Sequence, residues 1–371
     1  MLDLCPVHRR SPKFISPAGN VMLLYWLLFA LFATGAMLDT GGDPFRTKRP
    51  SSLILLAGMF IIVLVGLRFQ VGADWRSYEF MFSFAGYADF ARVIKYGDPG
   101  YQALNWLVQR ADFKIWVVNL ICAIIFTWGL LRLARTQPMP WLTVTVAIPY
   151  LVIVVAMGYS RQAVAIGIIM MGLAALARGG SLVRFAAYVA VAALFHKTAV
   201  VVLPLLVFSS ERNRFLNALA AIAGFVLLYD VFLAEDVDKL VKNYVEAEYS
   251  SQGAAIRVAM NLVPALIMLL RGQRLGLSPG EVRIWRAFSW TSIGLLALLI
   301  VTPSSTAVDR IALYMMPLQL IVLPRTVALF KSPQFGRLVV ILYAGAIQFT
   351  WLNFATHAEY WVPYQFFPFG P

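Results

Sequence analysis

Long apolar runs, separated by short polar stretches, occupy most of the chain. A helix that spans a bilayer needs about 20 mainly apolar residues, because the hydrocarbon core is roughly 30 Å thick. Runs of this kind lie at 20–38, 51–67, 114–133, 140–157, 162–178, 183–195, 198–208, 215–234, 256–271, 284–302, 311–330 and 336–353. The pattern predicts an all-α, polytopic integral membrane protein with about 11 to 12 transmembrane helices. We expect residues 1–371 to form a single transmembrane domain that begins with an N-terminal tail over 1–19.

Two of these runs, 183–195 and 198–208, are shorter than a full span requires. The polar sequence F-H-K-T at 195–198 separates them, and Pro204 follows. We favour a broken pair of short helices that meet on the outer side. The alternative is one continuous span across both runs, which would invert the topology of one half of the protein.

Composition supports the membrane assignment and excludes several classes of protein. With 60% hydrophobic and 13% charged residues, the chain does not resemble a soluble protein of its size. Its net charge of +13 is spread over many loops, so we expect no nucleic-acid partner. Two cysteines and three histidines do not suggest a disulfide framework or a zinc site. Since phosphate-loop and dinucleotide motifs are also missing from the sequence, we expect no metal and no cofactor.

Basic residues concentrate in alternate loops between the apolar runs. The positive-inside rule assigns these loops to the cytoplasm. The segments 68–113 and 235–256 then face outward, together with the short loops and both termini. The basic tail over 1–19 is the exception to this orientation. The outward surface collects most acidic residues, so any chemistry is expected there, at the extracytoplasmic face of the membrane.

Four cations stand at expected outer helix ends, namely Arg161, Lys197, Arg257 and Arg310. The helix macrodipole is positive at an N-terminus, so a cation there is misplaced unless an anion lies nearby. Free N–H groups combined with an arginine form a good phosphate site. Several such ends that converge would suit a pyrophosphate group. The alternative is that these side chains extend to lipid headgroups.

The sequence G-L-R-F-Q-V-G-A-D-W-R-S-Y at 66–78 follows an apolar run directly. It brings Arg68, Asp74, Arg76 and Tyr78 to the membrane surface. We expect Arg68 and Arg76 to bind substrate phosphate and Asp74 to act as a general base or sugar ligand. Alternatively, Arg68 and Asp74 form a structural ion pair. Tyr78 either stacks on a sugar or belongs to the interfacial aromatic belt.

His196 lies in the expected helix break. Polar residues at such positions are costly and often functional, and the unperturbed pKa of histidine suits proton transfer. The alternative is a hydrogen-bonded structural histidine. Asp98 and Tyr101, in D-P-G-Y, are further substrate-binding candidates, although Asp98 also suits a turn. Asp309 and its neighbour Arg310 can alternatively pair with each other.

Five motifs together carry a resemblance to a known family. They are the 66–78 sequence, D-P-G-Y-Q-A-L-N at 98–105, Y-S-R-Q-A-V-A-I at 159–166, A-A-L-F-H-K-T-A-V-V-V-L-P at 192–204 and D-R-I-A-L-Y at 309–314. In order and spacing, over roughly residues 20–330, the chain resembles the EpsG family of bacterial polysaccharide-biosynthesis membrane proteins. These are grouped with Wzy-type repeat-unit polymerases. The family often has Glu where Asp98 stands, which puts that position in doubt.

The resemblance implies roles for individual residues. Arg68, Gly72, Asp74 and Tyr78 match the first motif. Arg161 and Gln162 match the motif at 159–166, and His196 matches the motif at 192–204. Arg310 and Tyr314 match the last motif, at 309–314.

The resemblance also implies an activity, which is transfer of a glycan from undecaprenyl pyrophosphate to an incoming lipid-linked repeat unit. Such a polymerase makes exopolysaccharide, O-antigen or capsule at the extracytoplasmic face of the bacterial cytoplasmic membrane. It works without a metal, beside chain-length regulator and export proteins. The bilayer and the lipid-linked oligosaccharide are its other partners. On this basis Asp74 and His196 are the candidate catalytic residues. The competing functions are a transporter or flippase for lipid-linked sugars, a membrane acyltransferase, and a structural subunit of an export complex.

Overall fold

The structure is a computed structural model that describes residues 22–39, 52–209, 254–301 and 305–367, with 219, 222–224 and 226 in addition. Helices make up the regular structure of these residues, which contain no named strand and only an isolated bridge between Arg68 and Phe366. The expected span at 215–234, the expected loop at 235–256 and the tail at 1–19 lie wholly or largely outside the described residues.

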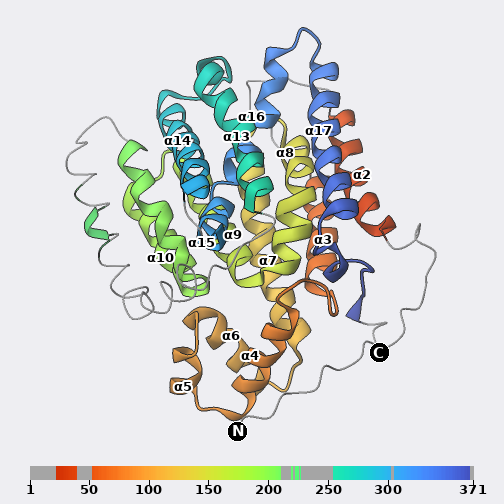
Figure 1. Cartoon of the computed structure of the whole chain (residues 1–371), viewed down its shortest axis with the longest axis vertical. Coiled ribbons are helices and arrows are strands. Elements are labelled where there is room, and N and C mark those ends of the chain that lie inside the picture. Colours follow the sequence, from red (N-terminus) through yellow and green to blue (C-terminus); the bar gives the residue numbers. More distant parts are fainter. Residues whose placement is uncertain are drawn as a thin grey trace.

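The apolar runs become a bundle of helices (Figure 1). Its elements are α2 (Leu23–Leu38), α3 (Leu53–Gly66), α7 (Ile115–Ala134), α8 (Pro140–Ala147), η1 (Ile148–Ala156), α9 (Ser160–Leu176), α10 (Leu182–Phe195), η2 (Lys197–Ser209), α13 (Ala254–Arg271), η5 (Gly272–Arg274), α14 (Pro279–Val301), α15 (Ser305–Leu313), α16 (Pro317–Arg325), η6 (Thr326–Leu329) and α17 (Pro333–Phe354). Among the described residues, four helical stretches, in α7, α13–η5, α14 and α17, are long and apolar enough to cross a membrane. Six shorter helical stretches are also apolar. The protein is an all-α polytopic membrane protein, as the sequence predicts.

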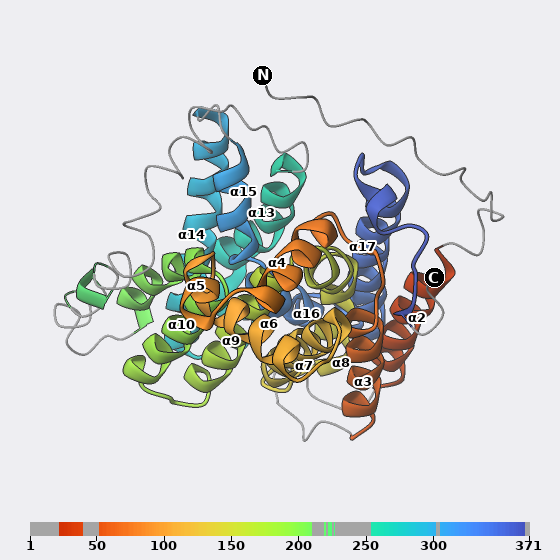
Figure 2. The ribbon, with the colours of Figure 1, turned by 90° about the horizontal axis from the view of Figure 1, so that it is seen from below.

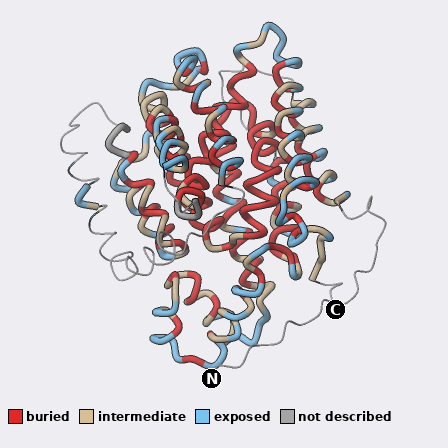
Figure 3. The backbone as a smooth tube through the Cα atoms, in the orientation of Figure 1, coloured by how far each residue is buried: buried red, intermediate tan, exposed pale blue. Residues whose placement is uncertain are grey.

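Helix α9 lies at the centre of the bundle and packs against α7 and α10. Its contact with α7 is close because glycines face each other: a Cβ added at Gly129 would overlap the carbonyl oxygen of Gly167. Small residues permit this approach in membrane helices, where van der Waals packing drives association. Figure 3 shows the resulting buried interior and the exposed outer faces of α13, α14 and α17.

The expected span at 140–157 is formed by α8 and η1, and η1 is a π-helix. Pro149 lies near its start and lacks the N–H group that an α-helix would use. Wider π-type turns often occur at functional sites. Here they form a buried wall from which Tyr150 and Val154 reach the cavity described below.

The chain reverses at His196, which has an extended backbone between α10 and η2. These two helices pack against each other. The broken pair predicted near 183–208 is therefore confirmed, and the continuous span is wrong.

The expected span at 311–330 is divided, because Pro317 starts α16 after a turn that follows α15. As a consequence, Arg310 lies in the last turn of α15, and not at a helix start. The prediction of a helix N-terminus at Arg310 is therefore wrong.

The expected outward segment, 68–113, forms three further helices at one end of the bundle, α4 (Trp75–Tyr87), α5 (Phe90–Lys95) and α6 (Pro99–Arg110). Helix α6 packs against α4, α7 and α10, and Figure 2 shows the group from that end. A short C-terminal segment with η7 (Ala358–Tyr360) follows α17.

Gly72 explains how the loop before α4 is placed. Its φ of 109° is unfavourable for a residue with a side chain, and a Cβ there would overlap the carbonyl oxygen of Met157. Its N–H donates a hydrogen bond to the Tyr360 carbonyl oxygen at 2.8 Å. The loop is thus held between the end of η1 and the C-terminal segment, and this position brings the nearby Asp74 to the cavity.

Candidate functional site

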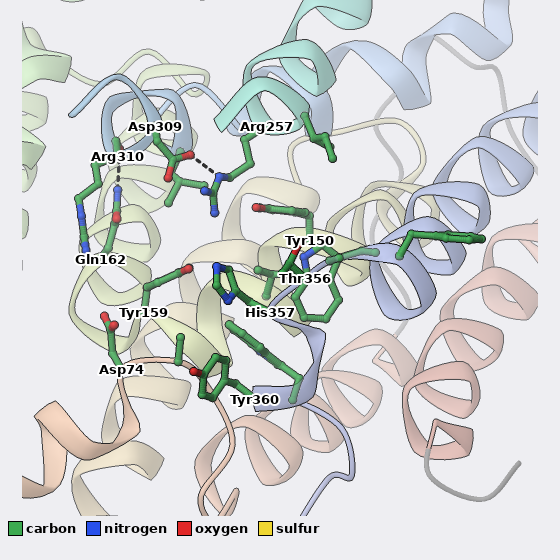
Figure 4. A pocket seen from close by; sticks show the side chains of 18 residues that line it. Asp74, Tyr150, Tyr159, Gln162, Arg257, Asp309, Arg310, Thr356, His357 and Tyr360 are labelled. Atoms are coloured by element: carbon green, nitrogen blue, oxygen red, sulfur yellow. Dashed lines mark hydrogen bonds and ion pairs between the residues drawn. The ribbon is translucent and has the colours of Figure 1, made fainter. Parts of the chain in front are cut away.

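A cavity of about 440 Å³ is lined by the loop before α4, by η1, by the starts of α9 and α13, by the end of α15, and by the end of α17 with the C-terminal segment. We call it the polar cavity, after the polar residues that line it. They are Asp74, Tyr150, Tyr159, Gln162, Arg257, Asp309, Arg310, Thr356, His357 and Tyr360 (Figure 4). The exposed His357 and Tyr360, at the C-terminal segment, lie on its accessible side. Six separate parts of the chain therefore contribute to one site.

Arg257 and Asp309 form an ion pair in the wall of the polar cavity, from Nε to Oδ1. Both side chains are 9% exposed. Arg257 stands in the first turn of α13, where the helix dipole disfavours a cation, so the carboxylate from α15 offsets that cost. Asp309 therefore pairs with Arg257, which joins α15 to α13.

Arg310 and Gln162 meet in the polar cavity. The Gln162 side-chain Nε2 donates a hydrogen bond to the Arg310 carbonyl oxygen at 2.7 Å. The Arg310 guanidinium carbon lies 5.9 Å from the centre of the Tyr159 ring, which is a cation–π distance. These contacts connect the start of α9 to the end of α15. They hold the backbone of Arg310 while its half-buried side chain lines the cavity.

Asp74 lines the polar cavity at the N-terminus of α4. Burial raises the pKa of its carboxyl group, and Arg310, Arg161 and His196 oppose that effect only in part. Desolvation disfavours the charged form, so a carboxylate in this environment is more basic than an exposed one. Figure 4 shows Asp74 on the side of the cavity that also carries Gln162 and Arg310.

A second group of charged residues, which we call the Asp98 cluster, lies where α6, α9 and the α10–η2 turn meet. Asp98 Oδ2 is 2.7 Å from Arg161 Nη1 and 3.6 Å from His196 Nδ1. Asp98 Oδ1 accepts a hydrogen bond from the Lys197 backbone N–H at 3.0 Å. The anion that the macrodipole argument requires near Arg161 is thus a carboxylate of the protein itself.

The pKa of the Asp98 carboxyl group shifts in the opposite direction from that of Asp74. Burial alone would raise the pKa of Asp98, but His196, Arg161 and the Lys197 amide together lower it below its ordinary value. A fully partnered carboxylate of this kind is a stable anion and a poor base.

Three buried tyrosines surround the Asp98 cluster. The rings of Tyr78 and Tyr101 are 5.5 Å apart, and the Arg161 guanidinium carbon lies 5.9 Å from the Tyr78 ring. The Tyr314 ring lies at 19° to the His196 ring, with 6.5 Å between the ring centroids. Burial raises the pKa of Tyr78 to about 12 and that of Tyr101 well above its ordinary value, so both phenols stay neutral. Both rings are almost fully buried, at 2% and 0% exposure, and they pack the cluster in place.

A comparison with family models decides the identity of the family. The model described as the EpsG family matches residues 52–366. The chain belongs to the EpsG family. The match confirms the resemblance found in the motifs, and it extends beyond them to include His357 and Tyr360. EpsG membership makes this chain a polysaccharide-biosynthesis membrane protein. Comparisons with curated proteins and with solved structures give no match.

Two predicted site residues of this EpsG chain lie elsewhere. Arg68 is 1% exposed and is not among the residues that line the polar cavity. Its guanidinium donates to the Val65 carbonyl oxygen, to Asn119 Oδ1 and to Ser160 Oγ, so it ties the end of α3 to α7 and α9. Arg76 is exposed on α4. Their predicted substrate contacts remain predictions.

Sequence reasoning did not select Tyr150, Tyr159 or His357. His357 follows the last apolar run, and the sequence gives no sign that this tail returns to the bundle. In the structure, Trp361 anchors it: the indole Nε1 donates to the Ile153 carbonyl oxygen at 2.8 Å, and Tyr25 Oη donates to the Trp361 carbonyl oxygen at 2.6 Å.

Proposed function

We propose that this EpsG-family protein is a membrane glycosyltransferase that polymerises lipid-linked oligosaccharide repeat units in exopolysaccharide, O-antigen or capsule synthesis. The observation that carries the proposal is the polar cavity, in which a basic carboxylate, Asp74, shares about 440 Å³ with Arg257 and Arg310. A glycosyl transfer from a lipid pyrophosphate needs one base and a cationic environment for the leaving group. The cavity offers both.

In the proposed reaction, a hydroxyl oxygen of the incoming repeat unit forms a bond to the anomeric carbon of the growing glycan. The bond between that carbon and the pyrophosphate oxygen breaks, and its electron pair leaves with undecaprenyl pyrophosphate. The hydroxyl proton moves to the Asp74 carboxylate. No nucleotide sugar is consumed, and the step needs no oxidant or reductant.

Asp74 suits the role of general base better than the other candidates. Burial raises its pKa, which strengthens it as a proton acceptor while its position in the cavity leaves it accessible to substrate. His196, the second candidate from the sequence, is only 9% exposed and lies beside Asp98. We therefore infer that His196 helps to position Asp98 and Arg161, and that Asp74 takes the proton.

Arg310 and Arg257 are the proposed electrostatic partners of the departing pyrophosphate. A guanidinium group presents five N–H donors in a planar fork, so Arg257 can keep its ion pair with Asp309 and still donate to an anion. Arg310 lies on the same side of the cavity as Asp74 (Figure 4). Its interaction with Asp74 also lowers the cost of ionising that carboxylate.

The test is the lipid-linked glycan profile of cells that carry Asp74→Asn, at matched membrane levels of the protein. We expect single repeat units to accumulate on the outer leaflet without polymer. The control is Asp89→Asn, because Asp89 caps α5 away from the cavity and asparagine caps helices equally well. Wild-type polymer from Asp74→Asn would refute the proposed base, and units trapped on the inner leaflet would indicate a flippase.

A further inference from the structure

A second hollow, of about 230 Å³, lies between α13 and α17. We call it the apolar groove. Its lining is Tyr150, Ile256, Met260, Tyr343, Ala346, Ile347, Thr350, Trp351, Phe354 and Ala355. Ala346, Thr350 and Phe354 are exposed along the outer face of α17, a helix apolar enough to span the membrane. The groove is therefore open to the bilayer along α17.

The apolar groove is continuous with the polar cavity. Tyr150, Ile256, Trp351, Phe354 and Ala355 line both. Along α13 the change is abrupt, since Ile256 faces both hollows and its neighbour Arg257 is among the charged residues of the polar cavity. The combined site thus carries two arginines beside two aspartates at one end and mainly apolar side chains at the other, which suits an amphiphile whose anionic head can bind the arginines.

We propose that the combined site binds a polyisoprenyl pyrophosphate, with the pyrophosphate beside Arg257 and Arg310 and the isoprenoid chain in the apolar groove between α13 and α17. This inference rests on the proposed function for the glycan that the lipid carries. It adds the position of the lipid and the route by which its chain leaves the protein. A groove of about 230 Å³ suits one flexible chain better than the two acyl chains of a phospholipid.

The two ends of the site contribute differently to binding. An isoprenoid chain that enters the groove moves from hydrocarbon to hydrocarbon, so the hydrophobic effect supplies little free energy and van der Waals packing supplies the rest. The affinity therefore resides mainly in the charged head. The groove fixes the direction of the chain, and this direction sets which atoms of the pyrophosphate-linked sugar face Asp74.

The experiment measures binding of radiolabelled undecaprenyl pyrophosphate to the full chain in phospholipid nanodiscs. Ala346→Trp places an indole in the groove, and we expect about tenfold weaker binding, since a steric conflict of this kind resembles over-packing of a core. The matched control is Leu342→Trp, at an exposed position of α17 that does not line the groove, with binding expected to remain as in wild type. If Ala346→Trp does not fold, Thr350→Trp makes the same test.

Two further measurements separate the possible outcomes. Inorganic pyrophosphate should bind equally to wild type and Ala346→Trp, because its site at the arginines is unchanged. Phosphatidylglycerol added in excess should not displace the labelled lipid. Wild-type binding by Ala346→Trp, or equal displacement by phosphatidylglycerol, would overturn the groove assignment.

The same preparation distinguishes this inference from the proposed function. Asp74→Asn should still bind undecaprenyl pyrophosphate, because Asp74 is an anion and not a ligand of the phosphates. If lipid binding follows the expected pattern but wild-type protein transfers no glycan, the groove assignment stands and the polymerase proposal fails. If wild type transfers glycan and Ala346→Trp binds the lipid as wild type does, the polymerase proposal stands and the groove assignment fails.

Discussion

Two aspartates, Asp74 and Asp98, illustrate how one membrane protein can use the same side chain in opposite ways. Both lie in the segment that follows α3, and both are largely buried near Arg161 and His196. Asp98 has close partners in Arg161 and in the Lys197 amide, and its pKa is lowered. Asp74 lines a cavity, and its pKa is raised by burial.

The difference has a consequence for stability. A carboxylate with a lowered pKa stabilises the folded state above its ordinary pKa, and that contribution is lost as the pH falls through the lowered value. A carboxylate with a raised pKa costs stability when ionised, and this cost is relieved as the pH falls. The first environment stabilises an ion pair, and the second is the kind of burial that raises the pKa of a general base.

The largest effect that would sharpen this contrast is expected at Arg310 in the polar cavity. Arg310→Gln should reduce the rate of glycan transfer about 100-fold, the usual effect of removing one donor to a developing negative charge. The measurement is the initial rate with purified protein. Arg184→Gln is the matched control, because Arg184 is exposed on α10 and does not line the polar cavity, and its rate should stay near wild type. Equal losses in both variants would remove Arg310 from the mechanism.

Asp98→Asn tests the structural half of the comparison. The variant leaves Arg161 partly buried without its anion, so we expect a loss of about 3 kcal/mol in the free energy of unfolding. Thermal unfolding in detergent measures it, with Asp74→Asn expected to be no less stable than wild type. The double variant Asp98→Asn/Arg161→Gln should regain part of the loss. A more stable Asp98→Asn protein would reverse the assignment of the two aspartates.

The pH dependence of unfolding tests whether the charge of Asp98 stabilises the fold, and the expected effect is smaller. The excess stability of wild type over Asp98→Asn should be full above the ordinary aspartate pKa of 3.8 and should decline as the pH falls further, because the pKa of Asp98 is lowered. A constant difference across this range would show that the Asp98 charge does not stabilise the fold.

The smallest effect is expected at Gln162, whose side chain holds the Arg310 backbone at 2.7 Å. Gln162→Leu removes this hydrogen bond, which is worth about 1 kcal/mol, so transfer should slow about fivefold. Transfer rates at several acceptor concentrations provide the measurement. If Gln162→Leu slows transfer as much as Arg310→Gln, Gln162 contacts the substrate directly.

Much of the fold follows from the sequence because its main signal is simple. Apolar length predicts the helices, and the polar sequence around His196 predicts the break between α10 and η2. The division of 311–330 does not follow from apolar length, because the apolar run continues through Pro317. In the structure Pro317 is the first residue of α16, a position that proline favours.

The site was only partly predictable, for a reason that lies in tertiary packing. The helix macrodipole makes Arg161 and Arg257 cations that need nearby anions, but the sequence does not show which anions these are. Asp98 and Asp309 come from distant elements, α6 and α15, and only the packed structure places them. His357 reaches the cavity through the anchoring of Trp361, which no local pattern reveals.

The pH dependence of glycan transfer by purified protein tests the central claim most directly, that Asp74 is a base with a raised pKa. Wild type should lose activity on the acid side with a midpoint above 3.8, the ordinary value for aspartate. Asp74→Asn should transfer glycan about 100-fold or more slowly than wild type, and this residual rate should show no acid limb. An unchanged acid limb in Asp74→Asn, at a rate close to that of wild type, would contradict the account.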